Sequence, residues 1–532
     1  MTPQRKLRLK PTVIDAREAG KLIKDGATVT VCGVSGTMVP DLTLAGIEAS
    51  FLSTGHPKDM TLFFPMLFGY ATTDGADHFG NKGMLKRVIG GSFHGGPGTV
   101  HKNDLYAPKL CTLVKEDLIE AYVFPLGVSY KLVRDISAGL PGTFSYVGLG
   151  TIIDPRNGGG KLNPRTKEDM VEIIKVQGRE MLFYKAFPID VAIIRGTTAD
   201  ELGNISLEEE SITTEVLHMA IAAHNSGGIV ICQVRRLAAA GSLNPRTVEV
   251  PGMLVDYIVV DPKQKQNTST PDYNPAISGE IRVPLPPIVS MPLNADKVIS
   301  RRALMELAPG MIVNLGGGLP TRGGLPMVAR EENIAQNVHF TIEHGALGGL
   351  CPGHINPTAF FTACDVMDLY HGSGLNQTFL GFMEIDSFGN ANLGRLGDFT
   401  DGPGGCIDIA TCTPRVGFVG SFTYGGLEVE VANGKLNIVK EGKAKKFVKK
   451  VQGAFFNSKY GTPKNQKVKY ITERAVFELQ GEGVTLTEFA PGVDVEKDIL
   501  NQMEFKPVIA RDLKEMNPKL FLEPRLGIGD KW

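Results

Sequence analysis

The stretch Thr341-Ile342-Glu343-His344-Gly345-Ala346-Leu347-Gly348-Gly349 places one carboxylate directly before a run of small residues and glycines. Upstream, Val313-Asn314-Leu315-Gly316-Gly317-Gly318-Leu319-Pro320 is typical of a short buried strand that opens into a glycine turn. Glycine lets a backbone approach a ligand closely and present its N–H groups. A lone acid between two such turns predicts a carboxylate that reacts covalently, with backbone amides near a developing oxyanion. The alternative is a pair of ordinary strand-end turns with a surface glutamate.

The pattern around the stretch from Val313 to Pro320 also occurs near the N-terminus. There, a helical stretch and Asp25-Gly26 precede the strand-like run Ala27-Thr28-Val29-Thr30-Val31, which leads to Gly33-Val34-Ser35-Gly36. In the second half, a helical stretch and Pro309-Gly310 precede Met311-Ile312-Val313-Asn314-Leu315 and its glycines. Both segments predict a helix, a glycine stop, a buried strand and a glycine turn.

A second echo follows the first in the same order. Asp200-Glu201-Leu202-Gly203-Asn204 follows the apolar run Val191–Ile194, and Asp386-Ser387-Phe388-Gly389-Asn390 follows the apolar run Thr378–Phe382. Two echoes in one order predict two related halves, with additional residues between the echoes in the first half.

The two halves are separated by a polar, proline-rich segment. It begins with Gln264-Lys265-Gln266-Asn267-Thr268-Ser269-Thr270-Pro271 and continues with Pro284, Pro286, Pro287 and Pro292. Such a segment disfavours a helix or a central strand and is typical of a surface linker. The prediction is a first domain over residues 1–264, a linker over 265–293 and a second domain over 294–532.

Each half alternates short runs rich in valine and isoleucine with helical stretches such as Thr214–Ala223. That alternation predicts an α/β fold with two related open halves and largely parallel sheets. The 63 glycines and 33 prolines suit many tight strand-to-helix turns, where α/β proteins commonly bind their ligands.

Composition narrows the functional class. With 532 residues the chain is too long for one ordinary core, and a net charge of −1 provides no broad basic field for a nucleic acid or an anionic membrane. The basic start Met1–Lys6 leads into no apolar run of signal-peptide type, and no segment is apolar for long enough to span a bilayer. We therefore expect a cytoplasmic protein without nucleic-acid or membrane partners.

The seven cysteines form no Cys-x-x-Cys pair, which is typical of reduced thiols in a cytosolic enzyme. Cys351 lies eight residues after Glu343 and is interpreted as a packing residue. The ten histidines show no HExxH or similar ligand spacing, so no metal site is predicted.

Several pieces of the chain together resemble the family I coenzyme A transferases, in the fused form that carries both halves on one polypeptide. The resemblance runs from about Ile14 to about Leu513 and is strongest to the bacterial acetate- or propionate-type short-chain acyl-CoA transferases. The matching pieces are Asn81-Lys82-Gly83, Lys86–Gly91, Gly127–Arg134, Ala222–Gly228, Asn314–Pro320, Glu343–Gly348, Gly402-Pro403-Gly404-Gly405, Gly425–Val429 and Ile471–Phe477.

The resemblance implies a fold of the CoA-transferase type (NagB/RpiA-like), with the active site between the halves. It also implies a ping-pong transfer of CoA from an acyl-CoA to a carboxylic acid such as acetate, with Glu343 as the covalent carrier. No metal, ATP or redox cofactor is needed, because exchanging one thioester for another is nearly isoergic, and CoA itself is a co-substrate. Relatives assemble as dimers or tetramers, so a homo-oligomer is expected.

The family pattern assigns roles to individual residues. Backbone contacts to CoA or to the oxyanion are expected from Gly317, Gly318, Leu319, Gly345, Gly404 and Gly405. The pocket for the carboxylic acid is expected to involve Gly90, Gly91, Leu126 and His344. A plain turn is the alternative for every one of these glycines. The run Lys443, Lys445, Lys446, Lys449 and Lys450 could offer charge to the CoA phosphates, although such a run is more often a solvated surface.

Two positions depart from the family pattern. Relatives commonly carry Gln at the position of Leu126, so Leu126 predicts weaker stabilisation of the oxyanion or a bulkier, more apolar acid. His344 follows Glu343 where relatives usually have a smaller or neutral polar residue. It is interpreted as a packed neighbour, and the alternative is an imidazolium that keeps Glu343 ionised or binds the acid.

Three other functions remain as alternatives. The same scaffold could hydrolyse an acyl-CoA by passing the glutamyl-CoA to water, or it could bind CoA without turnover. A nucleotide-dependent dehydrogenase is disfavoured, because Gly33-x-x-Gly36 and Gly316-Gly317-Gly318 lack the GxGxxG spacing with a downstream acid.

Overall fold

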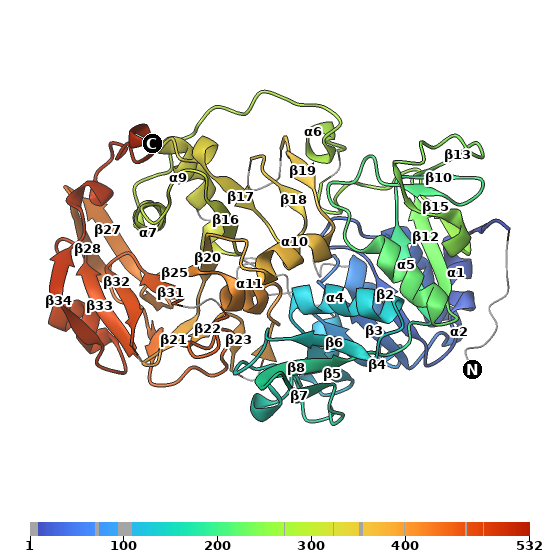
Figure 1. The fold of residues 1–532 in the computed structure, drawn as a ribbon, viewed down its shortest axis with the longest axis horizontal. Coiled ribbons are helices and arrows are strands. Elements are labelled where there is room, and N and C mark those ends of the chain that lie inside the picture. The colour runs from blue at the N-terminus through green and yellow to red at the C-terminus, as the bar shows by residue number, and fades with distance from the viewer. Residues whose placement is uncertain are drawn as a thin grey trace.

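A computed structural model describes residues 9–69, 74–93, 109–270, 272–322, 324–350, 355–397, 399–462, 465–481 and 483–532. Two open sheets form two halves that lie side by side, the first at the right of Figure 1 and the second at the left. Cys351 lies outside the described residues, and the six cysteines within them form no disulfide. Within the described ranges, no helix is long and apolar enough to cross a membrane.

The sheet of the first half has eight strands, all parallel. In spatial order they are β1 (Thr12–Ile14), β15 (Tyr257–Val260), β12 (Ile229–Val234), β9 (Val191–Arg195), β2 (Thr28–Val31), β3 (Met60–Phe64), β4 (Leu85–Gly90) and β5 (Glu120–Val123). Its helices are α1 (Ala16–Leu22), α2 (Asp41–Thr54), α3 (Lys109–Lys115), α4 (Leu126–Ser137) and α5 (Val216–Asn225).

The sheet of the second half has five parallel strands at its centre and antiparallel pairs on both sides of them, and its last two strands, β33 and β34, pair in parallel. In spatial order it contains β19 (Ala359–Phe360), β18 (Ala346–Leu347), β17 (His339–Thr341), β16 (Ile312–Leu315), β20 (Gln377–Gly381), β25 (Arg415–Val419), β31 (Lys467–Ile471), β32 (Ala475–Gln480), β33 (Gly483–Phe489) and β34 (Val508–Glu515). Its helices are α7 (Ala295–Leu304), α8 (Leu319–Arg322), α9 (Leu325–Glu331), α10 (Ala363–His371) and α11 (Cys406–Cys412).

Short strands build the smaller sheets around these two. In the first half they are β6 (Gly142–Ser145), β7 (Val171–Val176), β8 (Arg179–Lys185), β10 (Thr198–Asp200), β11 (Ile205–Ser206), β13 (Arg236–Ala238) and β14 (Val248–Val250). In the second half they are β21 (Glu384–Asp386), β22 (Ala391–Asn392), β23 (Arg395–Leu396), β24 (Phe399–Thr400), β26 (Thr423–Tyr424), β27 (Glu428–Ala432), β28 (Lys435–Lys440), β29 (Ala444–Lys445) and β30 (Phe447–Val448).

The predicted repeat is confirmed down to strand register. Val29 of β2 pairs with Val191 of β9, and at the equivalent positions Val313 of β16 pairs with Gln377 of β20. The glycine stops before β2 and β16 adopt the same left-handed conformation, with φ of 76° at Gly26 and 79° at Gly310. The five central strands of both sheets therefore have one topology, and the α/β fold with largely parallel sheets is confirmed.

The second echo forms the same turn twice. The Asp200 carboxylate accepts backbone N–H bonds from Leu202 and Asn204 and a side-chain N–H bond from Asn204, at 2.9–3.0 Å. The Asp386 carboxylate accepts the same three bonds from Phe388 and Asn390, each at 3.0 Å. A buried carboxylate that caps its own turn explains why this pattern can be found in the sequence.

The segment between the halves runs along the outside of the molecule in Figure 1, as a surface linker should. It differs from the expectation in one respect, because Pro275–Ser278 form one turn of helix, α6. The Asn274 side chain caps this turn by accepting from the backbone N–H of Ala276 at 3.0 Å, and Pro275 occupies a helix start, where proline is tolerated. The domain limits at residues 264 and 294 remain predictions.

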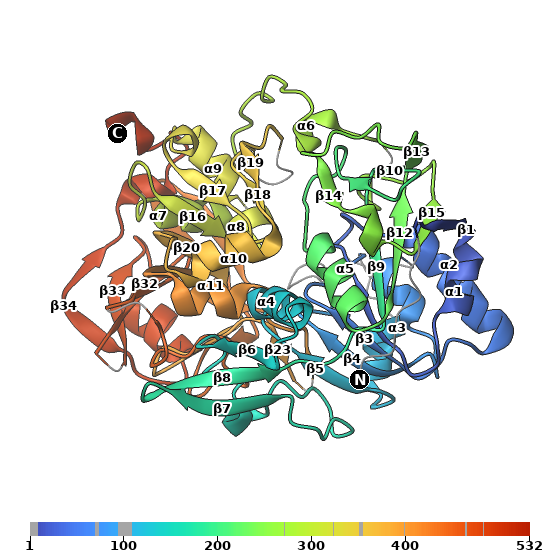
Figure 2. The same ribbon diagram turned by 45° about the vertical axis from the view of Figure 1, so that its right-hand side comes forward.

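Helix α4 of the first half joins the two halves. It packs against α10 and α11 of the second half and against α5 of its own half, and both views show it between these elements (Figures 1 and 2). Helix α4 begins at Leu126, directly after the two residues Phe124 and Pro125 that follow β5. The carboxyl ends of the central strands open toward this junction, where α/β sheets commonly bind ligands.

Candidate active site between the two halves

Glu343 lies in the turn between β17 and β18. The turn needs Gly345, because its φ is +104° and a Cβ at this position would come within 2.2 Å of the Phe361 carbonyl oxygen. The N–H of Gly345 donates to the carbonyl of Ile342 at 3.3 Å. Gly345 therefore shapes the turn that carries Glu343, and its own N–H is directed into that turn.

A cavity of about 110 Å³ contains Glu343 and is lined by both halves. Met66 and Ser92 come from the first half. The second half contributes Gly316, Gly317, Glu343, Leu380, Gly381, Leu393, Gly402, Pro403, Gly404, Gly405, Cys406 and Ile409. The reactive acid predicted from the sequence thus lies in a cavity shared by the two halves.

The glycine segment before α11 is tied to the first half through its backbone. The N–H of Gly404 donates to the carbonyl of Gly91 at 2.8 Å, and the N–H of Leu126 donates to the carbonyl of Gly404 at 2.8 Å. Nearby, the N–H of Phe93 donates to the carbonyl of Asp401 at 2.7 Å. These bonds hold one wall of the cavity against the other half, and they occupy the Gly404 N–H.

Gly405 is the residue of this segment that faces Glu343. A Cβ on Gly405 would come within 3.3 Å of the Cγ of Glu343 and equally close to Ile409 and Met367. Within the described ranges, the backbone N–H groups of Gly405 and Gly317 have no recorded acceptor. Both residues line the cavity that holds the carboxylate, so their N–H groups are candidate donors for a developing oxyanion.

Comparisons with known proteins decide the family. A model of the family described as "Coenzyme A transferase" matches residues 13–261. The caffeate CoA-transferase of Acetobacterium woodii is 41% identical, over 97% of this chain and 98% of its own. The acetate CoA-transferase YdiF of Escherichia coli K12 is 37% identical, over 97% of this chain and 96% of its own.

The chain belongs to the coenzyme A transferase family. A crystal structure of the YdiF apoenzyme from E. coli O157:H7 matches with a TM-score of 0.92 and 36% identity, covering 99% of both chains. A thioester complex of that enzyme with CoA matches with a TM-score of 0.91 and 36% identity, over 98% of this chain and 99% of its own. The predicted family, the fold and the transferase class of the enzyme are confirmed.

Five of the residues predicted from the sequence line the cavity of this transferase or the turn behind it: Gly317, Glu343, Gly345, Gly404 and Gly405. Gly318 adopts a left-handed conformation with φ of 85°, and Leu319 packs against the hydrophobic core at the start of α8. Gly318 and Leu319 do not line the cavity. Their positions keep Gly316 and Gly317 at the edge of the sheet.

Gly90, Gly91 and Leu126 lie one layer behind the cavity wall. A Cβ on Gly90 would come within 2.5 Å of the Phe64 ring, and one on Gly91 would come within 1.9 Å of the Pro65 carbonyl oxygen. The Leu126 side chain is fully buried in the core. These three residues shape the wall through backbone geometry, and their side chains or Cβ positions face packing neighbours.

His344 is not among the described residues that line the cavity, and it is partly buried. Its Nδ1 is buried and has no hydrogen-bond partner in the described structure. Burial lowers the pKa of His344, against the opposing effect of the Glu343 carboxylate. A neutral, packed imidazole agrees with the first interpretation from the sequence and weighs against a cation that keeps Glu343 ionised.

Sequence reasoning missed the residues that come from other segments. Met66 and Ser92 enter from the first half, and the Ser92 hydroxyl donates to the Met66 sulfur at 3.5 Å. The fully buried Asp408 of α11 accepts from the N–H of Gly127 at 3.1 Å and lies 2.8 Å from Nε2 of His371. Asp408 holds the start of α4, and only its place in a helix after the glycine segment could have indicated this role.

Few of the described residues that line the cavity have titratable side chains. Of the described lining residues, Glu343 and Cys406 have titratable side chains, and burial raises the pKa of the Cys406 thiol. In the part of the chain that the structure describes, no group of three or more His, Cys, Asp or Glu residues could hold a metal ion. Among the described lining residues, the carboxylate of Glu343 is therefore the candidate nucleophile that needs no deprotonation by a separate base.

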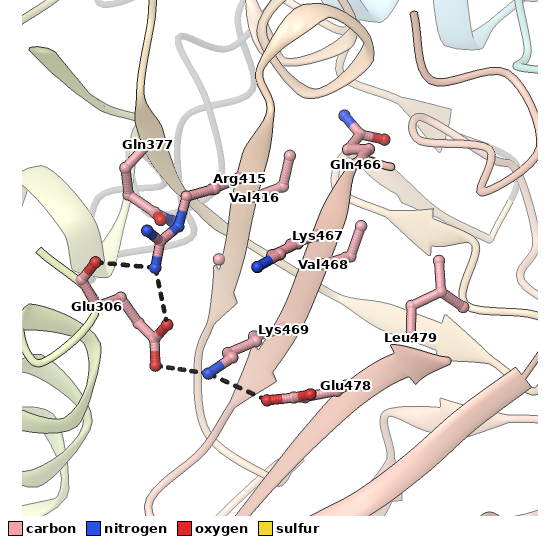
Figure 3. Close-up of a pocket in the computed structure, with 11 residues that line it drawn as sticks. Glu306, Gln377, Arg415, Val416, Gln466, Lys467, Val468, Lys469, Glu478 and Leu479 are labelled. Atoms are coloured by element: carbon pink, nitrogen blue, oxygen red, sulfur yellow. Dashed lines mark hydrogen bonds and ion pairs between the residues drawn. The ribbon is translucent and has the colours of Figure 1, made fainter. Parts of the chain in front are cut away.

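A larger cleft of about 290 Å³ lies at the other end of the strands and is shown in Figure 3. There, Glu306 bridges Lys469 at 2.8 Å and Arg415 at 3.5 Å, and Lys469 also pairs with Glu478 at 3.0 Å. Arg415 is the first residue of β25. Because α/β sheets bind ligands at the carboxyl ends of their strands, this cleft of paired charges is a poorer site than the smaller cavity.

Proposed function

We propose that this protein transfers CoA between a short-chain acyl-CoA and a monocarboxylic acid such as acetate, through a glutamyl-CoA thioester on Glu343. The observation that carries the proposal is the Glu343 carboxylate in a cavity shared by both halves and lined by Gly317 and Gly405, whose N–H groups have no recorded acceptor among the described residues. The names of the caffeate and acetate CoA-transferases at 41% and 37% identity support the same class of reaction.

Each half of the exchange consists of two acyl transfers. The Glu343 carboxylate attacks the thioester carbonyl, and the C–S bond breaks to give a mixed anhydride and CoA thiolate. The thiolate then attacks the glutamyl carbonyl, and the C–O bond breaks to give glutamyl-CoA and the first acid as its carboxylate. A second carboxylate repeats these steps in reverse, which regenerates Glu343 and releases the new acyl-CoA.

The backbone donors supply the stabilisation that each tetrahedral intermediate needs. Gly317 and Gly405 can direct N–H groups at an oxyanion formed next to Glu343, and each such donor contributes roughly 3–4 kcal/mol. The position of Gly405 is fixed before the reaction, because the neighbouring Gly404 is bonded to both Gly91 and Leu126. A preorganised wall avoids reorganisation when the negative charge moves from Glu343 to the oxyanion.

The lining favours transfer over hydrolysis, the first alternative. Met66, Leu380, Leu393 and Ile409 give the cavity an apolar wall that disfavours water. The described part of the lining contains no histidine, lysine or second carboxylate to activate a water molecule. An anhydride or thioester on Glu343 is therefore protected until a carboxylate or CoA enters.

The size and charge of the cavity favour a short, uncharged acyl group. An apolar cavity of about 150 Å³ accommodates benzene, so a cavity of about 110 Å³ suits acyl groups smaller than an aromatic ring. Among the residues that the structure describes, no cationic side chain lines the cavity, so a dicarboxylic acid would find no counter-ion there for its second carboxylate. Acetate and propionate are the expected acceptors, and succinate and caffeate are expected to react poorly.

Mass spectrometry of a trapped intermediate tests this proposal. The protein is incubated with acetyl-CoA, treated with hydroxylamine or borohydride, and digested. A modification on the peptide that contains Glu343 is expected, together with CoA transfer to propionate that exceeds thioester loss without an acceptor. An unmodified peptide would support the second alternative, binding without turnover. Thioester loss that is independent of the acceptor would support a hydrolase.

We further propose a homodimer or homotetramer in the cytoplasm, with CoA as a co-substrate and no permanently bound cofactor. The domain limits proposed from the sequence are residues 1–264 and 294–532. In chain order, the last strand of the first sheet is β15, which ends at Val260, and α7 of the second half begins at Ala295. These positions support the proposed limits. Light scattering of the purified protein tests the assembly, and a monomer would contradict it.

A further inference from the structure

The basic run after β28 is divided by the structure into one buried lysine and several exposed ones. Lys443, Lys449 and Lys450 are exposed, and the ammonium group of Lys445 donates to the carbonyls of Asn501 and Met503. Lys446 is only 8% exposed. The interpretation of the run as a solvated surface is therefore wrong for Lys446.

The surroundings of Lys446 do not neutralise its charge. Its Nζ lies 4.3 Å from the centre of the Phe382 ring, a cation–π contact. In the described structure, the ammonium group has no recorded hydrogen-bond acceptor or ion-pair partner. The nearby carboxylate of Glu473 is already engaged, because it accepts from the N–H of Phe422 at 2.9 Å and from Nε of Arg474 at 2.8 Å.

An unpaired buried ammonium group is costly for the fold. Burial lowers the pKa of Lys446 to about 8, against the opposing effect of Glu473. A charge taken out of water without a counter-ion destabilises a protein by several kcal/mol. Groups that are destabilised in this way commonly gather at functional sites, where a ligand supplies the missing partner. Lys446 is a group of this kind.

A row of glycines at the carboxyl ends of neighbouring strands lies between Glu343 and Lys446. The strands β17, β16, β20 and β25 are neighbours in this order, and glycines follow or end three of them: Gly316 and Gly317 after β16, Gly381 at the end of β20, and Gly420 after β25. A Cβ on Gly317 would meet no described atom within 4 Å, and one on Gly381 would meet only the Gly317 carbonyl oxygen, at 3.5 Å. The space above these two glycines is open.

Lys446 stands at the far end of this row. A Cβ on Gly420 would come within 3.2 Å of the Lys446 Nζ, so the ammonium group occupies the place of the missing side chain. The distance from β17 to β25 is three strand spacings, roughly 14 Å. The pantetheine arm of CoA, from sulfur to pyrophosphate, has the length of about four extended residues, roughly 14 Å.

We propose that Lys446 is a positioning residue that binds the pyrophosphate of CoA at the far end of this row of glycines from Glu343. The inference rests on the proposed function, because it takes the sulfur of CoA to lie at Glu343. Lys446 has no ion-pair partner in the described structure. A pyrophosphate would supply one, through a charge-assisted hydrogen bond. Remote binding energy of this kind drives the thioester toward the carboxylate.

The test compares two thioesters that share the pantetheine arm and differ in whether the nucleotide and its phosphates follow it. Wild type and Lys446→Met are assayed with acetyl-CoA and with acetyl-pantetheine, which lacks the phosphates, with propionate as acceptor. With acetyl-CoA, we expect Lys446→Met to lower kcat/KM by about tenfold or more, mainly through KM. With acetyl-pantetheine, kcat/KM should be the same for both proteins. Equal losses with both thioesters, or no loss with either, would overturn the proposal.

Two further measurements separate a ligand contact from a structural role. Methionine is apolar and similar in length, so Lys446→Met should unfold at the same Tm as wild type or a higher one. A marked fall in Tm would overturn the proposal. Lys450→Met, which removes an exposed lysine of the same run, should leave both kcat/KM values unchanged. Failure of the proposed function is recognised separately, because wild type would then form no adduct at Glu343 with either thioester.

Discussion

The backbone N–H of Leu126 donates to the carbonyl oxygen of Gly404 at 2.8 Å, across the junction of the two halves. Leu126 is the first residue of α4, and its side chain is fully buried. Where relatives commonly place a glutamine, this chain therefore acts on the site through its backbone. The bond fixes Gly404, and with it the neighbouring Gly405 that faces Glu343.

Replacing Leu126 by proline removes this N–H and is expected to impair the reaction. Proline is accepted at the first position of a helix, and the preceding Pro125 has the extended conformation (φ −60°, ψ 140°) that a following proline requires. Leu126→Ala is the matched control, because it also loses the buried side chain but keeps the N–H. We expect kcat/KM of Leu126→Pro to be about tenfold below that of Leu126→Ala.

Both Leu126 variants lose buried volume and should be less stable than wild type by about 2–5 kcal/mol. The assay is therefore run well below the lower of the two Tm values, and denaturation curves are recorded for both proteins. Equal kcat/KM values would show that the bond to Gly404 does not position the cavity wall.

The reach of the Glu343 side chain should be critical. Glu343→Ala and Glu343→Gln remove the nucleophile and should abolish transfer, with Tm little changed because no ion pair is recorded for Glu343 in the described structure. Glu343→Asp keeps the carboxylate but withdraws it by one methylene from the thioester, which should cost at least about 100-fold in kcat. Transfer assays with acetyl-CoA measure the loss, and retained exchange in Glu343→Ala would refute the assignment.

A methyl group at two cavity glycines should have different consequences. In Gly405→Ala, the new Cβ lies 3.3 Å from Glu343, Ile409 and Met367, so these neighbours must shift by a few tenths of an ångström. We expect kcat to fall about tenfold because the nucleophile is displaced. In Gly317→Ala the Cβ meets nothing within 4 Å, so kcat and Tm should hold while KM for acyl-CoA rises. Indistinguishable kinetics in the two variants would contradict this view of the wall.

The sequence contained enough information for the repeat, because each repeated feature is local. A glycine stop with positive φ, as at Gly26 and Gly310, and a carboxylate that caps its own turn, as at Asp200 and Asp386, are set by residues close together in the chain. Glu343 could be found for the same reason, since the glycines that shape its turn follow it directly.

The parts that could not be predicted depend on contacts between distant segments. The sequence predicts that Gly90 helps to shape the acid pocket, but the Phe64 ring fills the space beside it. In the sequence, Lys446 is one of several lysines expected at the surface. It is buried because Phe382 and Gly420, which are distant in the chain, pack against it. Ser92 belongs to no recognisable motif and reaches the cavity only because the halves meet there.

The final prediction concerns pH and the first half of the chain. The His78 side chain, 11% exposed, lies 2.6 Å from Glu48 and 3.2 Å from Asp41. Burial by itself lowers the pKa of His78, but the hydrogen bonds and charges of Asp41 and Glu48 outweigh it, so the pKa is raised. Although burial opposes the shift, the same contacts lower the pKa of both carboxyl groups.

The sign of the pH dependence follows from these directions. A raised histidine pKa contributes stability that is fully present below the unfolded value of about 6.5 and is lost as pH rises through the folded pKa. The carboxyl groups contribute stability above their unfolded values of about 4 and lose it as pH falls. The cluster should thus be most stabilising between about pH 4.5 and 6.5, and Tm should decline above that range.

His78→Asn should remove the decline of Tm above about pH 6.5, because no imidazolium remains to lose its proton. The matched control is His56→Asn, since His56 also pairs with an aspartate, Asp25 at 2.8 Å, but its side chain is 59% exposed and solvent screens the pair. Differential scanning fluorimetry from pH 5 to 9 compares the three proteins. If wild type and His78→Asn kept parallel curves while both unfolded reversibly, the charged cluster would not be the source of the pH dependence.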